Sequence, residues 1–317
     1  MPHAAKSSRV RRLPGKPPQR PAPKPHVAAP WSLRKAGGLR VLELAPWKKF
    51  SWLAHGFSTR PGGASVLPSG ERVLNLGFME WDKHESVQRN RAAFQAAIGA
   101  AKAQLVPLKQ IHSGIVQFFS GTPGEPCRGD ASISDAAGLL LAVQTADCVP
   151  ILLLDPKKRA VAAVHAGWRG TLARILEKTV GEMRVRFGSR PADLQAAIGP
   201  SIGACCYEVG TELVTEFSSQ FDGAEDFFDE LRTGEEPNPL QWLNMMPPGH
   251  QPPPKNVRLD LRKANRAQLL AAGLRDANIF ASELCTACHP SLLFSYRKEG
   301  PVSGRLMAAI GIIPSQK

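Results

Sequence analysis

Apolar residues recur at helical spacing in three parts of the chain. Residues 85–100 and 170–188 each place their apolar residues on one side of a helix, and the second segment ends in glycine. Residues 259–273 repeat the pattern between Asp260, a residue type that caps the first turn of a helix, and Gly273, which can end one. A period near 3.6 residues is typical of an amphipathic helix. The pattern therefore predicts three helices that each pack one side against a core.

Three short apolar runs follow one another closely between the first two of these helices. They cover residues 138–144, 149–154 and 160–165, and a turn from Asp155 to Arg159 separates the last two. Runs of this length between turn residues are typical of buried strands, and the short turn predicts a hairpin. Parallel strands need a crossover connection of a dozen or more residues, so a purely parallel sheet is not expected. Strands and helices alternate from about residue 41, which predicts a mixed α/β fold.

Two segments lack this periodicity. Residues 1–40 form a proline-rich tail with ten Lys and Arg and no Asp or Glu, which leaves only +3 of the net charge of +13 for residues 41–317. Such a tail cannot bury enough apolar surface to offset the entropy of ordering, so we expect it to be disordered. It is a solvated extension with no specific partner, a weak tether to nucleic acid or another anionic surface, or an organellar transit peptide. Residues 232–257 are polar and proline-rich, which predicts an exposed insertion.

Composition narrows the class of protein. The 317 residues include 43% hydrophobic and 21% charged residues, as in ordinary globular proteins that bury a sizeable core. No apolar run reaches the roughly 18–20 residues that span a bilayer, and the start of the chain lacks the apolar region of a secretory signal. Six cysteines are too few and too unevenly placed for a disulfide scaffold. These features predict a cytoplasmic protein with mostly reduced cysteines.

Three side chains with metal-binding chemistry stand at the ends of apolar runs. His112, Cys148 and His165 are each followed within two residues by a glycine or a proline. Strand ends present functional side chains on a rigid scaffold, and two imidazoles with one thiolate suit zinc. Three protein ligands would leave a fourth position for water or substrate, as in a catalytic zinc site. The spacing alone also fits two buried, hydrogen-bonded histidines and an apolar core cysteine, so this alternative stays open.

Longer motifs connect these residues to a known family. In chain order they are HGFSTRPGGAS (55–65), LNLGF (74–78), LKQIH (108–112), GDASISDAAGLLLAVQTADCVPILLLD (129–155), VHAGWRGTLARIL (164–176), AIGPSIGACCYEVG (197–210), LDLRKANRAQL (259–269) and CTACHPSLLFSYRKEG (285–300). In these motifs, residues 45–313 resemble the YfiH family, also called laccase-domain or peptidoglycan-editing-factor proteins and described as purine nucleoside phosphorylases. The resemblance implies one α/β catalytic domain over residues 41–317, with central mixed β-sheets packed as a sandwich and helices outside.

The resemblance also implies a metal centre. His112, Cys148 and His165 match the zinc ligands of the family, and a site of this composition could instead hold one copper ion. Asp147 then accepts a hydrogen bond from a ligating imidazole or acts as a general acid or base, unless it is only a turn residue.

Phosphorolysis of a nucleoside needs an anion site beside the anomeric carbon, which arginine and lysine side chains supply. Arg60 is favoured within the family-like segments because the glycines after it would let backbone amides join the site. Asn75 could bind a ribose hydroxyl or a base edge, or could cap a turn instead. We assign Arg60, Lys109 and Arg297 to catalysis together with Asp147, and Arg169 and Asn75 to substrate binding, although two of the basic residues could simply form surface ion pairs.

The remaining cysteines carry weaker signals. Cys285 and Cys288 form a C-x-x-C pair. One such pair without a second is weak evidence for a metal or redox site. We interpret the pair as structural or site-lining, and Cys205-Cys206 as part of a tight buried turn.

The leading hypothesis is a monomeric, zinc-binding purine nucleoside phosphorylase that cleaves adenosine, inosine or guanosine with phosphate. The resemblance implies adenosine deaminase and methylthioadenosine phosphorylase activity in the same site, and zinc suits deamination because it lowers the pKa of bound water. A cysteine hydrolase with Cys148 as nucleophile is an alternative that would connect the chain to peptidoglycan editing. A copper-dependent phenol oxidase is disfavoured because only eight histidines exist, and His3, His26 and His250 lie in the tail or the insertion. A nucleic-acid adaptor acting through the tail is the least favoured hypothesis.

Overall fold

The hairpin predicted from residues 149–165 lies at the centre of a six-stranded sheet. The structure, a computed structural model, describes residues 27–125, 127–230 and 256–313. The sheet has the order β16-β12-β10-β11-β8-β7, and β10 pairs antiparallel with β11. Its strands are β7 (Val116–Phe118), β8 (Ala131–Ser134), β10 (Val149–Asp155), β11 (Ala160–Ala166), β12 (Gln195–Ile198) and β16 (Ile279–Ala281). The outer pairs β7–β8 and β12–β16 are parallel, so the sheet is mixed as predicted.

A second six-stranded sheet has the order β1-β2-β3-β17-β9-β6. Its strands are β1 (Trp31–Ala36), β2 (Leu39–Leu44), β3 (Leu53–Ser58), β6 (Gln104–Pro107), β9 (Leu139–Thr145) and β17 (Leu306–Ile312). All pairs are antiparallel except β6 with β9. Every residue of the central strand β17 is buried. A strand covered on both faces is apolar throughout rather than alternating, which is what the sequence of β17 shows.

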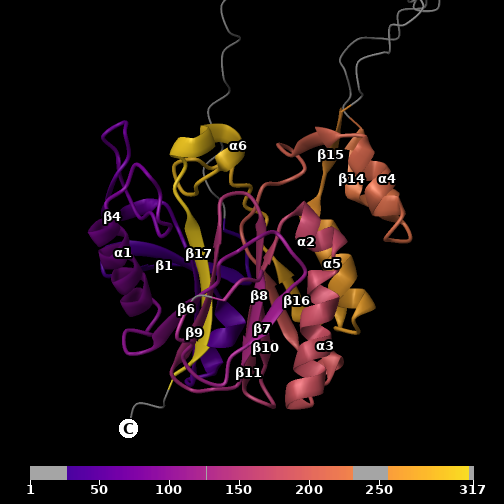
Figure 1. Ribbon diagram of the computed structural model, residues 1–317, viewed down its shortest axis with the longest axis horizontal. Coiled ribbons are helices and arrows are strands. Elements are labelled where there is room, and N and C mark those ends of the chain that lie inside the picture. Colours follow the sequence, from indigo (N-terminus) through magenta and orange to yellow (C-terminus); the bar gives the residue numbers. More distant parts are fainter. Residues whose placement is uncertain (1–26, 126, 231–255, 314–317) are drawn as a thin grey trace, which may run out of the picture.

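The two sheets pack face to face around one apolar core. Leu152 and Ala163 of the first sheet belong to the same buried cluster as Leu141 and Ala308 of the second. The outer faces are covered by helices, with α1 (His84–Ala97) on one side and α3 (Ile175–Phe187) and α5 (Leu261–Ala271) on the other, as Figure 1 shows. The predicted sandwich of mixed sheets with outer helices is confirmed.

The helices follow the predicted periodicity with one difference. The carboxylate of Asp260 caps α5 by accepting hydrogen bonds from the backbone N–H groups of Arg262 and Lys263. The single helix expected over residues 170–188 is instead two, α2 (Trp168–Leu172) and α3. The break lies at Arg174, which adopts a φ of 54°. This left-handed conformation interrupts the helical hydrogen bonds. The sequence did not indicate it, because this position holds an arginine and not a glycine, asparagine or proline.

Smaller elements complete the described chain. They are the pair β4 (Pro61–Val66) and β5 (Arg72–Val73), the sheet of β13 (Glu208–Gly210), β15 (Asn256–Leu259) and β14 (Phe228–Glu230), and the helices α4 (Glu212–Ser218) and α6 (Tyr296–Glu299). Short 3-10 helices cover Ala45–Lys49, Pro191–Asp193, Ala224–Phe227, Asp276–Asn278 and Gly300–Val302. Figure 1 shows α6 and α2 toward the same end of the sandwich.

The expected boundary of the tail at residue 40 is wrong. Residues 31–36 form β1, which pairs with β2 through a two-residue turn at Gly37 and Gly38. Both glycines have positive φ values, as such tight hairpins require. The Gly-Gly pair is the sequence signal of this turn, although it directly follows basic residues that resemble the tail. Residues 1–26 lie outside the described residues, as does the expected insertion at 232–257 except for its last two residues, which begin β15.

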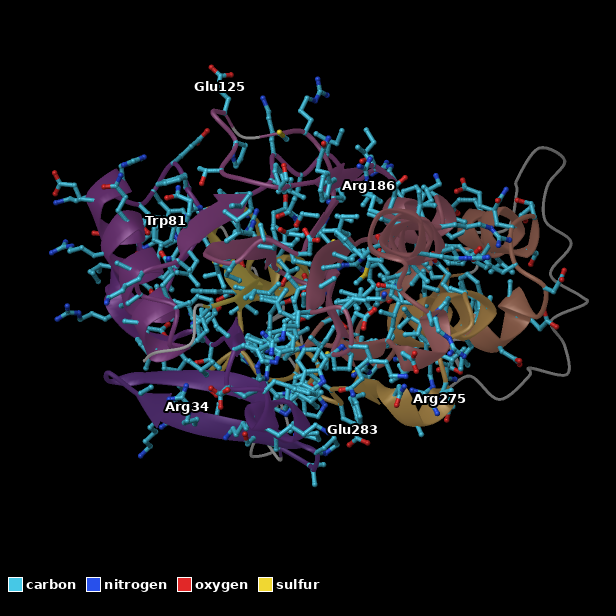
Figure 2. All side chains as sticks on the ribbon, turned by 90° about the horizontal axis from the view of Figure 1, so that it is seen from below. Arg34, Trp81, Glu125, Arg186, Arg275 and Glu283 are labelled. Carbon is cyan, nitrogen blue, oxygen red and sulfur yellow. The ribbon has the colours of Figure 1, made fainter. Side chains whose placement is uncertain are left out.

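Charged side chains differ in how they lie. Figure 2 shows Glu125 at the edge of the molecule, pointing away from the layers. Arg34 instead donates hydrogen bonds to the Glu43 carboxylate and to the Ala97 carbonyl at the end of α1. Within the described ranges, no helix is long and apolar enough to cross a membrane.

Candidate active site at a His-Cys-His cluster

The β10–β11 hairpin brings Cys148 and His165 together. Cys148 directly precedes β10, and His165 is the last residue but one of β11, opposite Pro150. His112 comes from the segment after β6 and adopts a φ of 57°. The ligand atoms of the three side chains lie within 4.8 Å of one another. The rings of His112 and His165 meet edge to face, with centroids 4.9 Å apart.

The three side chains differ in exposure. His165 is buried, Cys148 is half-buried and His112 is exposed. The cluster is therefore anchored in the core on one side and open on the other. A metal ion held by two imidazoles and a thiolate at such a place would keep a position for water or substrate, so these residues fit a catalytic rather than a structural zinc site.

The carboxylate of Asp130, which the sequence analysis missed, organises this cluster. It is fully buried and accepts a hydrogen bond from Nδ1 of His165 at 2.9 Å. It also accepts bonds from the backbone N–H of His112 at 3.0 Å and from the N–H and hydroxyl of Ser113 at 2.6 and 2.7 Å. Because Nδ1 of His165 donates to Asp130, Nε2 is the nitrogen that is free to bind a metal. One carboxylate thus orients both the buried imidazole and the loop that carries the exposed one.

Charges within the cluster shift the pKa values of its members. Burial opposes ionisation of the Cys148 thiol, but the charge of His165 and hydrogen bonds from both histidines outweigh burial and lower the pKa of Cys148 to about 6. Burial likewise opposes protonation of His165, but the charge of Cys148 and the hydrogen bond to Asp130 raise its pKa to about 9. The pKa of Asp130 lies well below its usual range, because the bonds from His165 and Ser113 overcome the effect of burial. The cysteine is therefore set up as a thiolate, the form that binds metals and attacks electrophiles.

A pocket of about 690 Å³ opens over the cluster. Its walls combine the aromatic side chains of Trp168, Tyr207 and Tyr296 with the guanidinium groups of Arg169, Arg297 and Arg305. Within the part of the chain that the structure describes, none of these three arginines forms an ion pair with a carboxylate. A pocket of this size accommodates a small molecule, and its unpaired cations suit an anionic group.

An aromatic ring lies against each of these arginines, and the guanidinium of Arg169 lies 4.3 Å from the centre of the Trp168 ring. The guanidinium of Arg297 lies 5.2 Å from the centre of the Tyr207 ring and donates a hydrogen bond to the Glu208 carbonyl. Arg305 lies 5.7 Å from the Tyr296 ring. Burial, together with the nearby charge of Cys148, raises the pKa of Tyr207 to about 12, so its hydroxyl remains protonated at neutral pH.

Asp147 lines the pocket but does not orient a histidine. It has a φ of 96°, and its two carboxylate oxygens accept hydrogen bonds from the Thr286 hydroxyl at 2.5 Å and the Arg297 N–H at 2.6 Å. The expectation that Asp147 accepts a bond from a ligating imidazole is therefore wrong, because Asp130 holds that place. Its possible role in proton transfer is compatible with its position in the pocket wall.

Three of the expected site residues do not line the pocket. Arg60 is buried and forms ion pairs with Glu71 and Glu299. These carboxylates neutralise the charge that was expected to bind phosphate. Lys109 contributes backbone hydrogen bonds to the Cys127–Gly129 segment. Asn75 is fully buried and bonds to Gly77, Asp82 and the N–H of Arg305, which is the turn-capping alternative. The favoured position for Arg60 in an anion site is thus not supported.

The residues that the sequence analysis missed had only faint signals. Asp130 follows a glycine and directly precedes β8, the strand that pairs with β11. Arg305 directly precedes β17, and Tyr207 and Tyr296 lie within the family-like motifs 197–210 and 285–300, where no separate signal distinguishes them from their neighbours. An acidic residue at the start of a buried strand next to the His165 strand was the one local hint.

Comparisons with known proteins agree with this architecture. Residues 54–313 match the family model described as multi-copper polyphenol oxidoreductase laccase. The chain is 34% identical over 276 residues to purine nucleoside phosphorylase YlmD from Geobacillus stearothermophilus, which covers 83% of this chain and 91% of that protein. It is 39% identical over 181 residues to adenosine deaminase RL5 from an unknown prokaryotic organism, covering 57% of this chain and 61% of that protein. The crystal structure of the hypothetical protein YfiH from Bacillus licheniformis superposes with a TM-score of 0.73 at 28% identity, covering 90% of this chain and all of that one.

Proposed function

The chain belongs to the multi-copper polyphenol oxidoreductase laccase family, which also includes proteins named purine nucleoside phosphorylase, and we propose that it is a metal-dependent purine nucleoside phosphorylase. We further propose that it deaminates adenosine in the same pocket, an activity that the name of one relative supports. The observation that carries the proposal is that one pocket combines the His112, Cys148 and His165 donors with unpaired arginines and aromatic rings.

The arginines provide the anion site of the proposed reaction. In phosphorolysis an oxygen of inorganic phosphate bonds to C1′ of the ribose while the bond from C1′ to the purine breaks. Arg169, Arg297 and Arg305 face the pocket without a carboxylate partner in the described chain, so their charge is available to phosphate. Guanidinium groups bind phosphate through paired, charge-assisted hydrogen bonds. We assign phosphate binding to these arginines, and no longer to Arg60.

Aromatic rings and Asp147 serve the purine. Tyr207, Tyr296 and Trp168 offer flat apolar surfaces on which a base can stack. Asp147 is the only acidic side chain among the described residues that line the pocket. Thr286 and the Arg297 N–H fix its two oxygens, so it is held where it can move a proton to or from the base.

The donor set fits a zinc ion better than a multicopper centre. His112, Cys148 and His165 would hold one ion, and Asp130 keeps Nε2 of His165 directed toward it. A bound zinc ion would supply Lewis acidity and lower the pKa of water for deamination. A multicopper centre needs further histidines, yet within the described residues no other candidate metal group contains one. Among residues 27–125, 127–230 and 256–313, no methionine lines the pocket as the long axial ligand of an electron-transfer copper site.

Product analysis tests this function. The purified full chain is incubated with adenosine, inosine, guanosine or methylthioadenosine, with and without inorganic phosphate, and free base, sugar phosphate and ammonia are measured. We expect base release that requires phosphate, and ammonia release from adenosine that does not. Base release at equal rates without phosphate would instead indicate a hydrolase and contradict the phosphorylase assignment.

A cysteine hydrolase remains the second candidate because the electrostatics of Cys148 favour a thiolate. Its lowered pKa beside His165 is the arrangement of an activated nucleophile. The two readings compete, since a thiolate bound to zinc is not available for attack. If Cys148 in the purified protein reacts rapidly with iodoacetamide and no metal is present, the hydrolase is favoured. Protection of Cys148 that is lost on chelation favours the metal enzyme.

A further inference from the structure

A second group of four cysteines meets outside the site described above. Cys205 and Cys206 follow β12, whereas Cys285 and Cys288 follow β16, its parallel neighbour in the sheet. An isolated bridge between Ser201 and Cys285 brings the two loops together. The four sulfur atoms lie within 4.8 Å of one another. A C-x-x-C pair that looked solitary in the sequence thus has a second pair of cysteines beside it.

The distances between these sulfur atoms suit tetrahedral coordination. Sγ of Cys288 lies 3.5 Å from that of Cys205 and 3.4 Å from that of Cys206. Four sulfurs at a zinc–sulfur distance of about 2.3 Å would stand about 3.8 Å apart. A disulfide would need about 2.05 Å, and all four cysteines are free thiols in the structure. Small shifts would therefore close the group around an ion.

The surroundings favour the thiolate of Cys285, whereas burial and the neighbouring sulfurs raise the pKa of Cys205 to about 12 and also raise that of Cys206, so an ion would have to displace their protons. The backbone N–H of Gly203 donates a hydrogen bond to Sγ of Cys285 at 3.2 Å. A Cβ at Gly203 would lie 3.2 Å from the Cys205 sulfur and 2.9 Å from a guanidinium nitrogen of Arg262, so the sulfur and the cation both approach this backbone position closely. Four thiolates around a divalent ion carry a net charge of −2, and the nearby arginine offsets part of it. Donors to the sulfurs and a neighbouring cation are what a thiolate metal site requires.

We propose that Cys205, Cys206, Cys285 and Cys288 form a second metal site, which binds one zinc ion through four thiolates. Four protein ligands leave no position for substrate, so the site is structural. Cys285 is buried whereas Cys205 is exposed, which gives the ion a route of entry from solvent. The assignment is independent of the proposed catalytic function.

The proposed ion stabilises one wall of the pocket. Tyr207 directly follows Cys206, and its N–H donates to the Gly203 carbonyl. On the other loop, Thr286 directly follows Cys285 and donates its hydroxyl to Asp147. The four-cysteine site therefore connects the loop that carries the stacking tyrosine with the loop that fixes the pocket carboxylate. It acts as a cross-link where a cytoplasmic protein would not keep a disulfide.

Metal content per chain tests the proposal. The full chain is purified under reducing conditions without chelators, and zinc per chain is measured by mass spectrometry for the natural protein, the double variant Cys285→Ser/Cys288→Ser, Cys148→Ala and Cys127→Ser. Cys127 belongs to neither cysteine-containing group and is the matched control. We expect two zinc ions in the natural protein and in Cys127→Ser, and one in each of the other variants. The same zinc content in the double variant as in the natural protein would overturn the proposal.

Cobalt substitution covers the case in which the double variant does not fold. Cys148→Ala reloaded with Co²⁺ keeps five cysteines, which are the isolated Cys127 and the four-cysteine group. Strong thiolate-to-cobalt charge-transfer absorption in this variant would therefore come from the four-cysteine group. Strong absorption of this kind supports the site, and its absence overturns it. Intact-mass analysis that finds a disulfide between the two cysteine pairs in protein purified without reductant, with no second metal, would also overturn it. Loss of nucleoside turnover alone bears only on the catalytic proposal, so the two failures are distinguishable.

Discussion

Replacement of Asp130 by asparagine should weaken metal binding at the His-Cys-His cluster without changing the shape of the side chain. Asp130 accepts hydrogen bonds from His165, His112 and Ser113 at 2.6–3.0 Å. Asparagine offers a single acceptor oxygen, and its NH₂ group would face at least one of these donors. A buried donor left without a partner costs about 1–3 kcal/mol. This cost opposes the orientation of His165 that metal binding needs. Loss of such an orienting partner typically weakens metal affinity 10–100-fold, or about 1.4–2.7 kcal/mol.

The assay is a titration in which a chromophoric chelator competes with the protein for zinc. It measures the affinity for the ion that the natural protein binds and Cys148→Ala loses. Asp155→Asn is the matched control, because Asp155 is also a buried carboxylate that accepts backbone N–H bonds, from Lys157 and Lys158 in the hairpin turn. We expect this control to lose stability but keep its metal affinity. If Asp130→Asn folds and binds zinc as tightly as the natural protein, the role given to Asp130 is refuted.

Three further predictions follow from single residues. Arg305→Gln should raise the KM for phosphate about 10–100-fold and leave adenosine deamination nearly unchanged, whereas the exposed Arg186→Gln on α3 should change neither. His55 is buried and accepts a hydrogen bond from the Leu44 N–H, and burial lowers its pKa from 6.5 to about 4. Between pH 6.5 and 4, His55 is therefore protonated in the unfolded chain but neutral in the folded chain. The free energy of unfolding should therefore fall by about 3 kcal/mol as the pH drops from 6.5 to 4 through this group, and denaturant titrations of His55→Gln should lack that component. Phe94→Ala should lower the free energy of unfolding by about 3–5 kcal/mol because it empties the contact of α1 with its sheet, and Phe94→Leu should cost much less.

The fold could be predicted where the pattern was local. The hairpin from Val149 to Ala166, the cap at Asp260 and the helices over 85–100 and 259–273 depend on residues close together in the sequence, and the structure confirms them. The break at Arg174 could not be predicted, because its left-handed backbone has no sequence signal. Hairpin β1–β2 has a signal in its Gly-Gly turn, but its basic residues share the composition of the tail, which conceals the strands.

The site depends on contacts between distant residues, and there the sequence was less informative. Arg60 stands beside glycines that favour an anion site, but its charge is neutralised by Glu71, 11 residues away, and by Glu299, 239 residues away. Asp130 had only the faint signal of an acidic residue before a buried strand, because its contact with His165 requires β8 to pair with β11. The two cysteine pairs were each weak motifs, and only the parallel pairing of β12 with β16 brings them together.

We propose that this chain uses a metal centre at His112, Cys148 and His165 to cleave purine nucleosides with phosphate. Zinc content and base release from inosine, measured with and without phosphate for the natural protein and Cys148→Ala, test this proposal. We expect phosphate-dependent release of hypoxanthine with ribose 1-phosphate as coproduct, and the joint loss of one zinc ion and of activity in the variant. A natural protein that holds no metal, whose Cys148 alkylates readily and which turns over no nucleoside, would contradict it.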